Sequence, residues 1–334
     1  MYQAEYSMLH SFRDNDIELI FAIDTDAVGQ LYWSYACTGN IDPNSSFIRN
    51  IPSDGAHDLV RRERPDLIIH RYYNYRPVMH WNAYLAAKQF NIPFIYLDME
   101  REYPPNELSF FDLEPITLSR VFLHAHPLHE ERQDQIEKTG VHMHFYPYGV
   151  SSFERYNPIG HERDLGAFGF YRNMPTRTAN AEMFFEGARR LGKTVDVFAD
   201  WNEYHGPYRE MLNVCPRYNS IDTVGIMSNY KIALDFHTYP DKPEHLSHKT
   251  WQTVGCGLLT LSPRLQLMEQ LFGPSGENLV YVQSSDEVEC SIREMLANPQ
   301  KRMAIARRGE KYVHEKFDWF KRFNEIMVQE SVWS

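Results

Sequence analysis

The sequence predicts an α/β protein with two doubly wound domains that face each other across a cleft. Short, continuously apolar segments alternate with segments of helical spacing along the chain, which is typical of parallel sheets covered on both faces. The same alternation occurs in both halves, and residues 148–160 between them are rich in Gly, Ser, Asn and Pro, as expected of a linker. Ligands of such sheets bind outside the carboxyl ends of the strands, so we expect the main site between the domains.

In the first half, apolar residues at helical spacing open the chain. Asp54 is a candidate N-cap of a later helix, and Pro77 suits the first turn of the next one. Helices are predicted at 2–13, 54–64, 77–90 and 128–138. Runs of apolar and β-branched residues predict strands at 17–23, 67–70, 94–99, 120–125 and 142–150.

The second half repeats the pattern, and Gly192 closes its first helix. Strands are predicted at 165–171, 194–199, 231–236, 257–262 and 278–282. Helices are predicted at 178–191, 249–255, 286–297 and 299–315. Large apolar residues in the tail predict a last helix. The expected domains are therefore 1–153 and 154–315, followed by 316–334 as a helix that crosses back to the first domain.

The composition narrows the class of protein. The 334 residues suggest about two domains, and a net charge of −11 argues against a general nucleic-acid binder. No apolar run reaches the roughly 18 residues of a membrane span, and the first residues lack the features of a signal peptide. The four cysteines, at 37, 215, 256 and 290, are far apart, which indicates reduced thiols in a cytoplasmic protein.

The densest group of chemical motifs lies in residues 231–261. A strand is followed by a polar loop with three histidines, and a helix then begins near Ser247. The free N–H groups and the dipole of a helix start favour anions, and Lys249 adds a cation. The alternative interpretation is a solvated loop before a capped helix, and spacing alone does not decide between the two.

This segment resembles the C-terminal domain of GT-B fold glycosyltransferases, specifically the spore-maturation (CgeB-like) branch related to glycosyltransferase family 4. The match consists of KIALD at 231–235 and KTWQTVGCG at 249–257, and the pattern continues to about residue 325. The first half is similar only in topology. The resemblance implies two Rossmann-like domains in the GT-B architecture. It also implies an enzyme that transfers a hexosyl or pentosyl group from a UDP- or GDP-linked sugar.

The resemblance also implies two glutamates, one near the donor sugar and one that holds the ribose. Here they correspond to Glu244 and Gln252. An amide is a weaker, uncharged acceptor, so donor affinity or activity is open. Lys249 replaces the family arginine and keeps the charge without the bidentate fork. His245 in the same loop is a further candidate for donor binding.

Other donor-side candidates follow two predicted strands. After the first, Gly169 would let the backbone approach a phosphate, and Arg172 and Arg177 would stabilise the leaving diphosphate. After the second, Asp200 and Trp201 resemble a family motif. The alternatives are surface arginines and a tryptophan that only packs.

Acceptor-side candidates follow strands of the first half. A carboxylate or a histidine could take the acceptor proton, which makes Asp98, Glu100 and His124 candidates for the base. A polar, aromatic loop could stack on a sugar or meet an anion. Its candidate residues are Arg71, Tyr73, Tyr75 and Arg76.

The leading hypothesis is a transferase without metal or cofactor, since the one DxD match, at 24–26, follows a strand of the first half. One alternative is a non-catalytic module that binds a nucleotide sugar or a partner. Another is a phage-type enzyme that glycosylates a modified DNA base, for which Arg61, Arg62 and Arg64 would contribute to a basic patch. The acceptor is a glycan, a protein or such a base, no integral membrane contact is expected, and the oligomeric state is open. Because the chain starts at a helix, we also expect that the first domain lacks its usual first strand or that the recorded start lies downstream of the true one.

Overall fold

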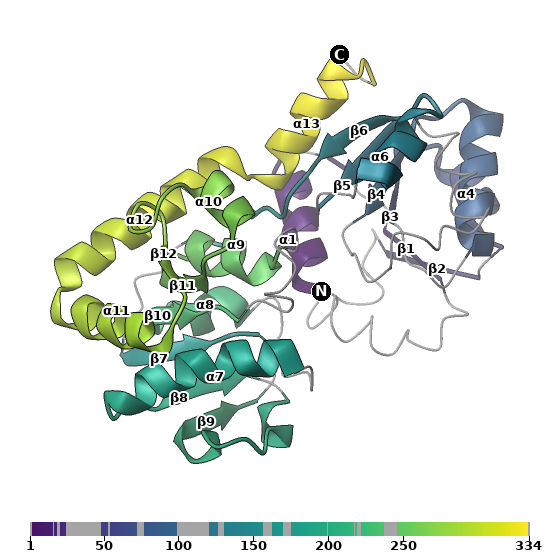
Figure 1. Ribbon diagram of the computed structural model, residues 1–334. Helices are drawn as coiled ribbons and strands as arrows, with labels where there is room; N and C mark the ends of the chain where they lie inside the picture. Colours follow the sequence, from purple (N-terminus) through teal and green to yellow (C-terminus); the bar gives the residue numbers. More distant parts are fainter. Residues whose placement is uncertain are drawn as a thin grey trace. The chain divides into compact units, whose positions relative to one another are not determined.

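The computed structural model of the protein divides into two compact units (Figure 1). The large unit contains Met1–Asp14 and Tyr148–Trp319, and the small unit contains Asn15–Pro147 and Phe320–Ser334. The structure describes residues 2–15, 17–18, 21–24, 48–52, 54–71, 77–98, 120–125, 130–155, 162–169, 175–198, 200–216, 218, 222–236 and 246–332.

The large unit is a parallel sheet covered by helices. Its strands are β7 (Arg163–Ala167), β8 (Val195–Phe198), β9 (Leu212–Cys215), β10 (Tyr230–Leu234), β11 (Leu259–Pro263) and β12 (Val280–Val282). Its helices are α1 (Tyr2–Arg13), α7 (Pro175–Arg190), α8 (Thr223–Met227), α9 (His248–Gly255), α10 (Gln266–Phe272), α11 (Ser285–Ala297) and α12 (Pro299–Lys316). Two 3₁₀ turns complete it, η1 (Trp201–Glu203) and η2 (Arg209–Met211).

The strand order of this sheet defines where a ligand can bind. The order is β12-β11-β10-β7-β8-β9, and every pair is parallel. Counted from first to sixth along the chain, this is the doubly wound order 3-2-1-4-5-6. The order reverses between β7 and β10, so the crevice outside the carboxyl ends of these two strands is the place where such sheets bind their ligands.

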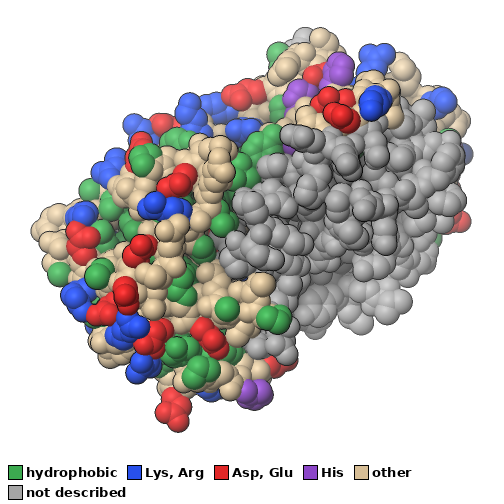
Figure 2. All heavy atoms as spheres, viewed as in Figure 1, with side chains coloured by type: hydrophobic (Ala, Val, Ile, Leu, Met, Phe, Trp, Pro, Cys, Tyr) green, Lys and Arg blue, Asp and Glu red, His purple; other side chains and the backbone are tan. Residues whose placement is uncertain are grey.

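The core of the large unit explains why its elements form. Residues of β7, β8, β10, β11 and β12 are buried together with one face of α7 and of α11, and α7 packs against α11 (Figure 1). Strands buried on both faces need continuous apolar runs, which is the pattern in the sequence. On the face in Figure 2, acidic and basic side chains are interspersed over the large unit.

The small unit has two parallel sheets in the described part of the chain. One is β1 (Phe21–Asp24) with β2 (Ile48–Ile51), and the other has the order β3 (Ile68–Arg71), β4 (Phe94–Asp98), β5 (Val121–His124), β6 (His142–Phe145).

The helices of the small unit cover the four-stranded sheet. They are α3 (Ala56–Glu63), α4 (Pro77–Phe90), α6 (Glu130–Glu137) and α13 (Trp319–Gln329), of which the last lies in this unit from Phe320 on. Ala56, Tyr84 and Phe94 form a core between α3, α4 and β4. Phe122 and Ile136 do the same between β5 and α6. No helix in the described residues is long and apolar enough to cross a membrane.

The predicted α/β fold class is confirmed, and so are most predicted elements within a few residues. The prediction missed β2, β9, α8 and α10. The expected cap at Asp54 is wrong, because α3 begins one residue later with Gly55 at the N-cap and without a side-chain cap. β7 starts earlier than predicted since its polar first residues are neutralised: Asp164 binds Lys193 and Lys231 at 2.7 and 2.6 Å.

The division into units also differs from the expected boundary at residue 153. Helix α1 groups with the large unit rather than with the first-half sheet. The reason is visible in its buried serines: Ser7 donates a hydrogen bond to Glu154, and Ser11 donates to Asp318 at 3.1 Å. Among the described residues, Cys215, Cys256 and Cys290 are free thiols.

Candidate functional site

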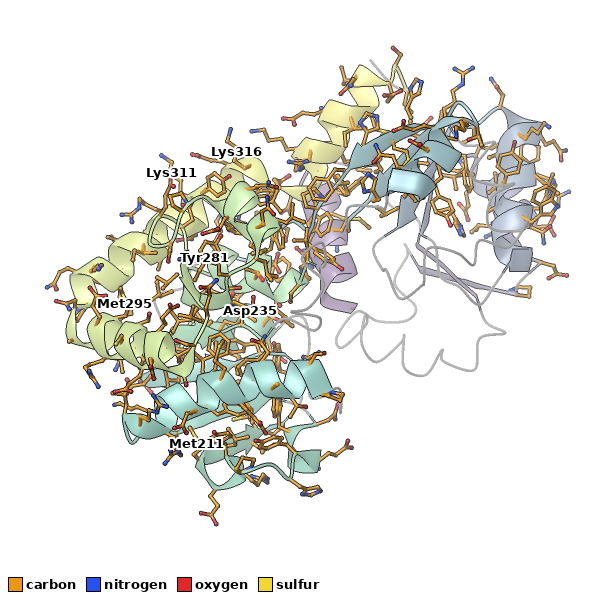
Figure 3. All side chains as sticks on the ribbon, viewed as in Figure 1. Met211, Asp235, Tyr281, Met295, Lys311 and Lys316 are labelled. Carbon is orange, nitrogen blue, oxygen red and sulfur yellow. The ribbon has the colours of Figure 1, made fainter. Side chains whose placement is uncertain are left out.

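Two strand ends meet at the switch point of the large unit's sheet. β7 and β10 are neighbours, with Gly166 in register with Ala233. Gly169 follows β7 by two residues, and Asp235, labelled in Figure 3, directly follows β10. The carboxyl ends of parallel strands lie at the same edge of the sheet, so Gly169 and Asp235 lie at the edge where such sheets bind their ligands.

The structure brings Gly169 and Arg177 together at the end of β7. Arg177 lies in the first turn of α7 and is only 6% exposed. A Cβ atom on Gly169 would lie 2.9 Å from Nη2 of Arg177, so only glycine leaves the guanidinium its present position. The indole Nε1 of Trp201 donates to the carbonyl of Gly169 at 2.8 Å and fixes the backbone there.

Lys249 supplies a second cation at the same edge. Its Nζ donates to Oε1 of Gln252 at 2.9 Å and to the hydroxyl of Tyr218 at 3.3 Å. Tyr218 in turn donates to the carbonyl of Phe168 at 3.4 Å, which ties Lys249 to the end of β7. Burial lowers the pKa of Lys249 to about 7, the negative charge of Glu154 opposes this shift, and the positive charge of Arg177 adds to it.

Gln252, the candidate for ribose binding, is 1% exposed and hydrogen-bonded at both ends of its amide. Its Oε1 accepts from Lys249, and its Nε2 donates to Oε1 of Glu154 at 3.0 Å. Glu154 also accepts from the hydroxyl of Ser7 and from the backbone N–H of Ser151. Burial raises the pKa of Glu154 to about 7, against the effect of these hydrogen bonds and of Lys249.

Helix α9, which carries Lys249 and Gln252, is locked onto the sheet. Thr250 donates to Oδ2 of Asp235, and Ser262 of β11 donates to the same oxygen at 3.3 Å. Trp251 is fully buried, and its ring meets Phe272. The aspartate that closes the KIALD motif therefore holds α9 in register with the strand ends.

The candidates Asp200 and Trp201 lie after β8. Asp200 precedes the 3₁₀ turn η1, and Trp201 is 1% exposed in the apolar core. Its ring contacts Phe185 and Phe236 edge to face. Of the two interpretations that the sequence leaves open, the structure therefore shows packing for this tryptophan, and its indole acts on the site through Gly169.

In the small unit, three candidates lie along one sheet edge. Arg71, Asp98 and His124 are the last residues of β3, β4 and β5, and Asp98 is in register with His124. Only the backbone of Arg71 and Asp98 is described. His124 is 8% exposed, and its ring stacks on Phe122 and contacts Phe145.

The remaining candidates lie outside the described residues. They are Glu100, Glu244, Arg172, His245, Tyr73, Tyr75 and Arg76.

Three residues of this site are absent from the sequence-based candidates: Ser7, Glu154 and Tyr218. Glu154 and Gln252 are 98 positions apart, and Ser7 and Glu154 are 147 apart. Glu154 lies in a stretch whose composition indicates an exposed linker, so no local signal marks it as buried.

The arginines proposed for a DNA-facing patch are locally engaged. Arg61 pairs with Asp58 at 3.1 Å, and Arg62 pairs with Glu63 at 3.0 Å. Arg64 lies 4.1 Å from the ring centre of Phe90. Arg61 and Arg62 therefore each face a carboxylate of the same helix, and Arg64 lies against an aromatic ring.

Comparison with known proteins indicates the class of protein to which this site belongs. Residues 177–328 match the profile of a family described as glycosyl transferase-like. The matched segment contains Arg177, Lys249 and Gln252 of the site described above. A search of curated proteins finds no match.

Solved structures share the fold over nearly the whole chain. HepE of Anabaena, crystallised with UDP, is 12% identical with a TM-score of 0.65, and the match covers 99% of this chain and 96% of HepE. A glycosyltransferase from Rickettsia africae is 10% identical at a TM-score of 0.65, with 98% and 93% covered. S. aureus MnaA, solved with UDP, is 11% identical at 0.54, with 99% and 94% covered.

These matches and the two parallel sheets define the class: an enzyme with the GT-B fold of glycosyltransferases, built from two Rossmann-like domains. The expected α/β fold class with two Rossmann-like domains is thereby confirmed, and the expected activity is confirmed at the level of a glycosyltransferase. The large unit contains most of the matched domain and the switch point between β7 and β10.

Proposed function

We propose that the protein transfers a sugar from a nucleoside-diphosphate sugar to an acceptor hydroxyl, and that the crevice at the ends of β7 and β10 binds the donor. The observation that carries this proposal is the convergence of two cations there. Arg177 lies against Gly169, and Lys249 reaches the end of β7 through Tyr218. A buried guanidinium and a half-buried ammonium group beside a glycine are suited to a diphosphate.

The chemistry follows from where charge develops. As the bond between the sugar and the diphosphate breaks, negative charge grows on the leaving phosphate, and fixed positive groups stabilise it. Arg177 and Lys249 supply that charge without a metal ion, and we propose a metal-independent transfer on this ground. Their fixed positions, held by Trp201 through Gly169 and by Gln252 and Tyr218, mean that little reorganisation is needed at the moment of reaction.

For the nucleotide, UDP is our first candidate. HepE was crystallised with UDP and with UDP-glucose, and MnaA with UDP, which supports a uridine nucleotide more than GDP. For the acceptor, we retain the three classes expected from the sequence: a glycan, a protein or a modified DNA base. We propose the edge of Arg71, Asp98 and His124 as the acceptor side, with Asp98 or His124 as the proton acceptor.

The test is a binding and turnover series on the full chain. A ligand that binds only the folded state raises the melting temperature, so UDP, GDP and their sugars are screened by thermal shift, and donor hydrolysis is then measured. We expect a UDP-dependent shift that Arg177→Gln removes and that Arg308→Gln, a surface control on α12, leaves in place. No shift with any diphosphate, and no hydrolysis of any donor, would refute the proposal.

One observation favours a second candidate, a non-catalytic module that binds a nucleotide sugar. Both ends of the Gln252 amide are committed to neighbouring side chains, which leaves the expected ribose contact without its usual carboxylate. Tight UDP binding without hydrolysis or transfer, for any donor and acceptor, would support this candidate over the enzyme.

A further inference from the structure

We propose that Glu154 is a positioning residue of the donor site, which holds the ammonium group of Lys249 in place through the amide of Gln252. The role in donor binding rests on the proposed function, whereas the coupling of the three side chains does not. Glu154 is fully buried, so it cannot touch a substrate and acts only through its neighbours.

The position of Glu154 is fixed by three hydrogen-bond donors from three places. Ser7 of α1 donates its hydroxyl, Ser151 its backbone N–H at 3.0 Å, and Gln252 of α9 its amide N–H at 3.0 Å. Ser7 is itself held by the indole N–H of Trp319 at 3.1 Å. A carboxylate with this many donors is oriented rigidly.

The same chain fixes the orientation of Gln252. In the form with Lys249 protonated and Glu154 ionised, the ammonium group only donates and the carboxylate only accepts. The amide between Lys249 and Glu154 therefore has one orientation that satisfies both, with Oε1 toward Lys249 and Nε2 toward Glu154. An amide side chain at residue 154 can both donate and accept, so it would no longer require a donor from Gln252. The carbonyl of Gln252 would then no longer be held toward Lys249.

Glu154 also supplies charge for the cation. Among the groups that act on Lys249, Glu154 contributes most to keeping the ammonium form, followed by Cys256 and Asp235, while burial and Arg177 favour its loss. Removal of the carboxylate charge therefore weakens the positive charge at the end of β7. An anionic ligand at the end of β7 would therefore bind more weakly, although it never contacts Glu154.

The test exchanges the two side chains. Glu154→Gln removes the charge, Gln252→Glu places two carboxylates in contact, and the double variant E154Q/Q252E returns one carboxylate and one amide to the pair. In the double variant the amide at position 154 can accept from Ser7 and Ser151 and can donate to the carboxylate at position 252, so the network closes again. Asp196→Asn is the matched control, since Asp196 is also buried and hydrogen-bonded, to Tyr230 and Asn213.

Two readouts separate positioning from mere stability. Melting temperatures without nucleotide measure the coupling of the pair, and dissociation constants for UDP and for uridine measure the effect on the diphosphate. We expect Glu154→Gln to weaken UDP binding about tenfold, the size of one charge-assisted contact, and to leave uridine binding unchanged. The double variant should recover UDP affinity and stability relative to Gln252→Glu, while Asp196→Asn should not change UDP affinity.

Each outcome decides a separate point. Unchanged UDP affinity in Glu154→Gln, an equal loss for uridine, or a double variant no better than Gln252→Glu overturns the positioning role. If the wild-type chain binds neither UDP nor GDP, the proposed function fails. In that case the melting temperatures of the four forms still decide whether Glu154 and Gln252 are coupled, because additive effects would refute the coupling.

Discussion

Replacing Gly169 by alanine is expected to weaken nucleotide binding while leaving the fold nearly intact. The new Cβ atom would lie 2.9 Å from Nη2 of Arg177, closer than carbon and nitrogen normally approach. The atom that the new Cβ would contact is the end of the flexible Arg177 side chain and not backbone, so the guanidinium can move aside. Gly169 does not adopt a positive φ, so alanine adds no backbone strain.

The size of the effect follows from what Arg177 would lose. A hydrogen bond to a charged group contributes about 1.5–3 kcal/mol, and about 1.4 kcal/mol corresponds to a factor of ten in affinity. If displacement costs one contact between Arg177 and the diphosphate, UDP binding should weaken roughly 10- to 100-fold. The melting temperature should fall by no more than a few degrees, because the change in stability is within about 1 kcal/mol.

The assay compares the dissociation constant for UDP in the wild type, Gly169→Ala and Arg177→Gln by calorimetry, with melting temperatures in parallel. We expect the two variants to be similarly impaired and the double variant to be no worse than Arg177→Gln alone. The reasoning is refuted if Gly169→Ala binds UDP like the wild type while Arg177→Gln does not. It is also refuted if Gly169→Ala unfolds the large unit.

Three further predictions concern stability. Glu154→Gln should flatten the pH profile of the free energy of unfolding between about pH 4.5 and 7, because burial raises the pKa of Glu154 to about 7. The folded wild type keeps a proton on this carboxyl group through that range and loses stability as the pH rises. The amide of the variant does not titrate, so its stability does not change in this way. Gly309→Ala should lower the melting temperature, at a cost of about 1–3 kcal/mol, because its Cβ atom would overlap a backbone carbonyl. Gly225→Ala, with no atom within 4 Å of its Cβ, should raise the melting temperature slightly. Equal shifts in melting temperature for the two variants would contradict both expectations. Glu330→Gln should destabilise the small unit near neutral pH, as measured by urea unfolding. Burial alone would raise the pKa of Glu330, but hydrogen bonds from two histidines of β6 hold that pKa below 4.5. The stability difference between the variant and the wild type should therefore shrink, and not grow, as the pH falls below 4.5.

The elements that the sequence predicted best are those whose residue pattern fits only one type of secondary structure. Helix α4 was predicted at its observed bounds because Pro77 opens it and Asn91, with a positive φ, ends it. The missed elements are short and mixed in character. β9 alternates apolar and polar residues over four positions, and α8 has five residues with a central glycine. Such segments are set by tertiary contacts more than by their own propensity.

The candidate site was predictable where its residues share a local motif. Lys249 and Gln252 lie on one helix, Gly169 follows β7, and Arg177 lies in the first turn of α7, so a strand-to-helix pattern places each pair. Glu154 was not predictable. Burial of a carboxylate depends on donors brought from α1 and α9, and neither its flanking residues nor its spacing indicates that those helices meet there.

The two departures from the family pattern, at residues 249 and 252, are explained together by Glu154. The resemblance implies Arg and Glu at these positions. A glutamate at 252 would bring its carboxylate against Glu154, whose Oε1 lies 3.0 Å from the present amide nitrogen, and two carboxylates that close cannot both stay ionised. A guanidinium at 249 would then lack the carboxylate that completes its two parallel bonds, whereas the ammonium of Lys249 needs only the single acceptors that Gln252 and Tyr218 provide.

This argument predicts how arginine at residue 249 should behave. Lys249→Arg alone should weaken UDP binding, because Gln252 offers the guanidinium one neutral oxygen. In the E154Q/Q252E background the same substitution should leave UDP binding unimpaired, because a carboxylate then faces the guanidinium fork. Calorimetry with UDP on both pairs of proteins measures the difference. If Lys249→Arg has the same effect in both backgrounds, the two departures are independent and Glu154 does not link them.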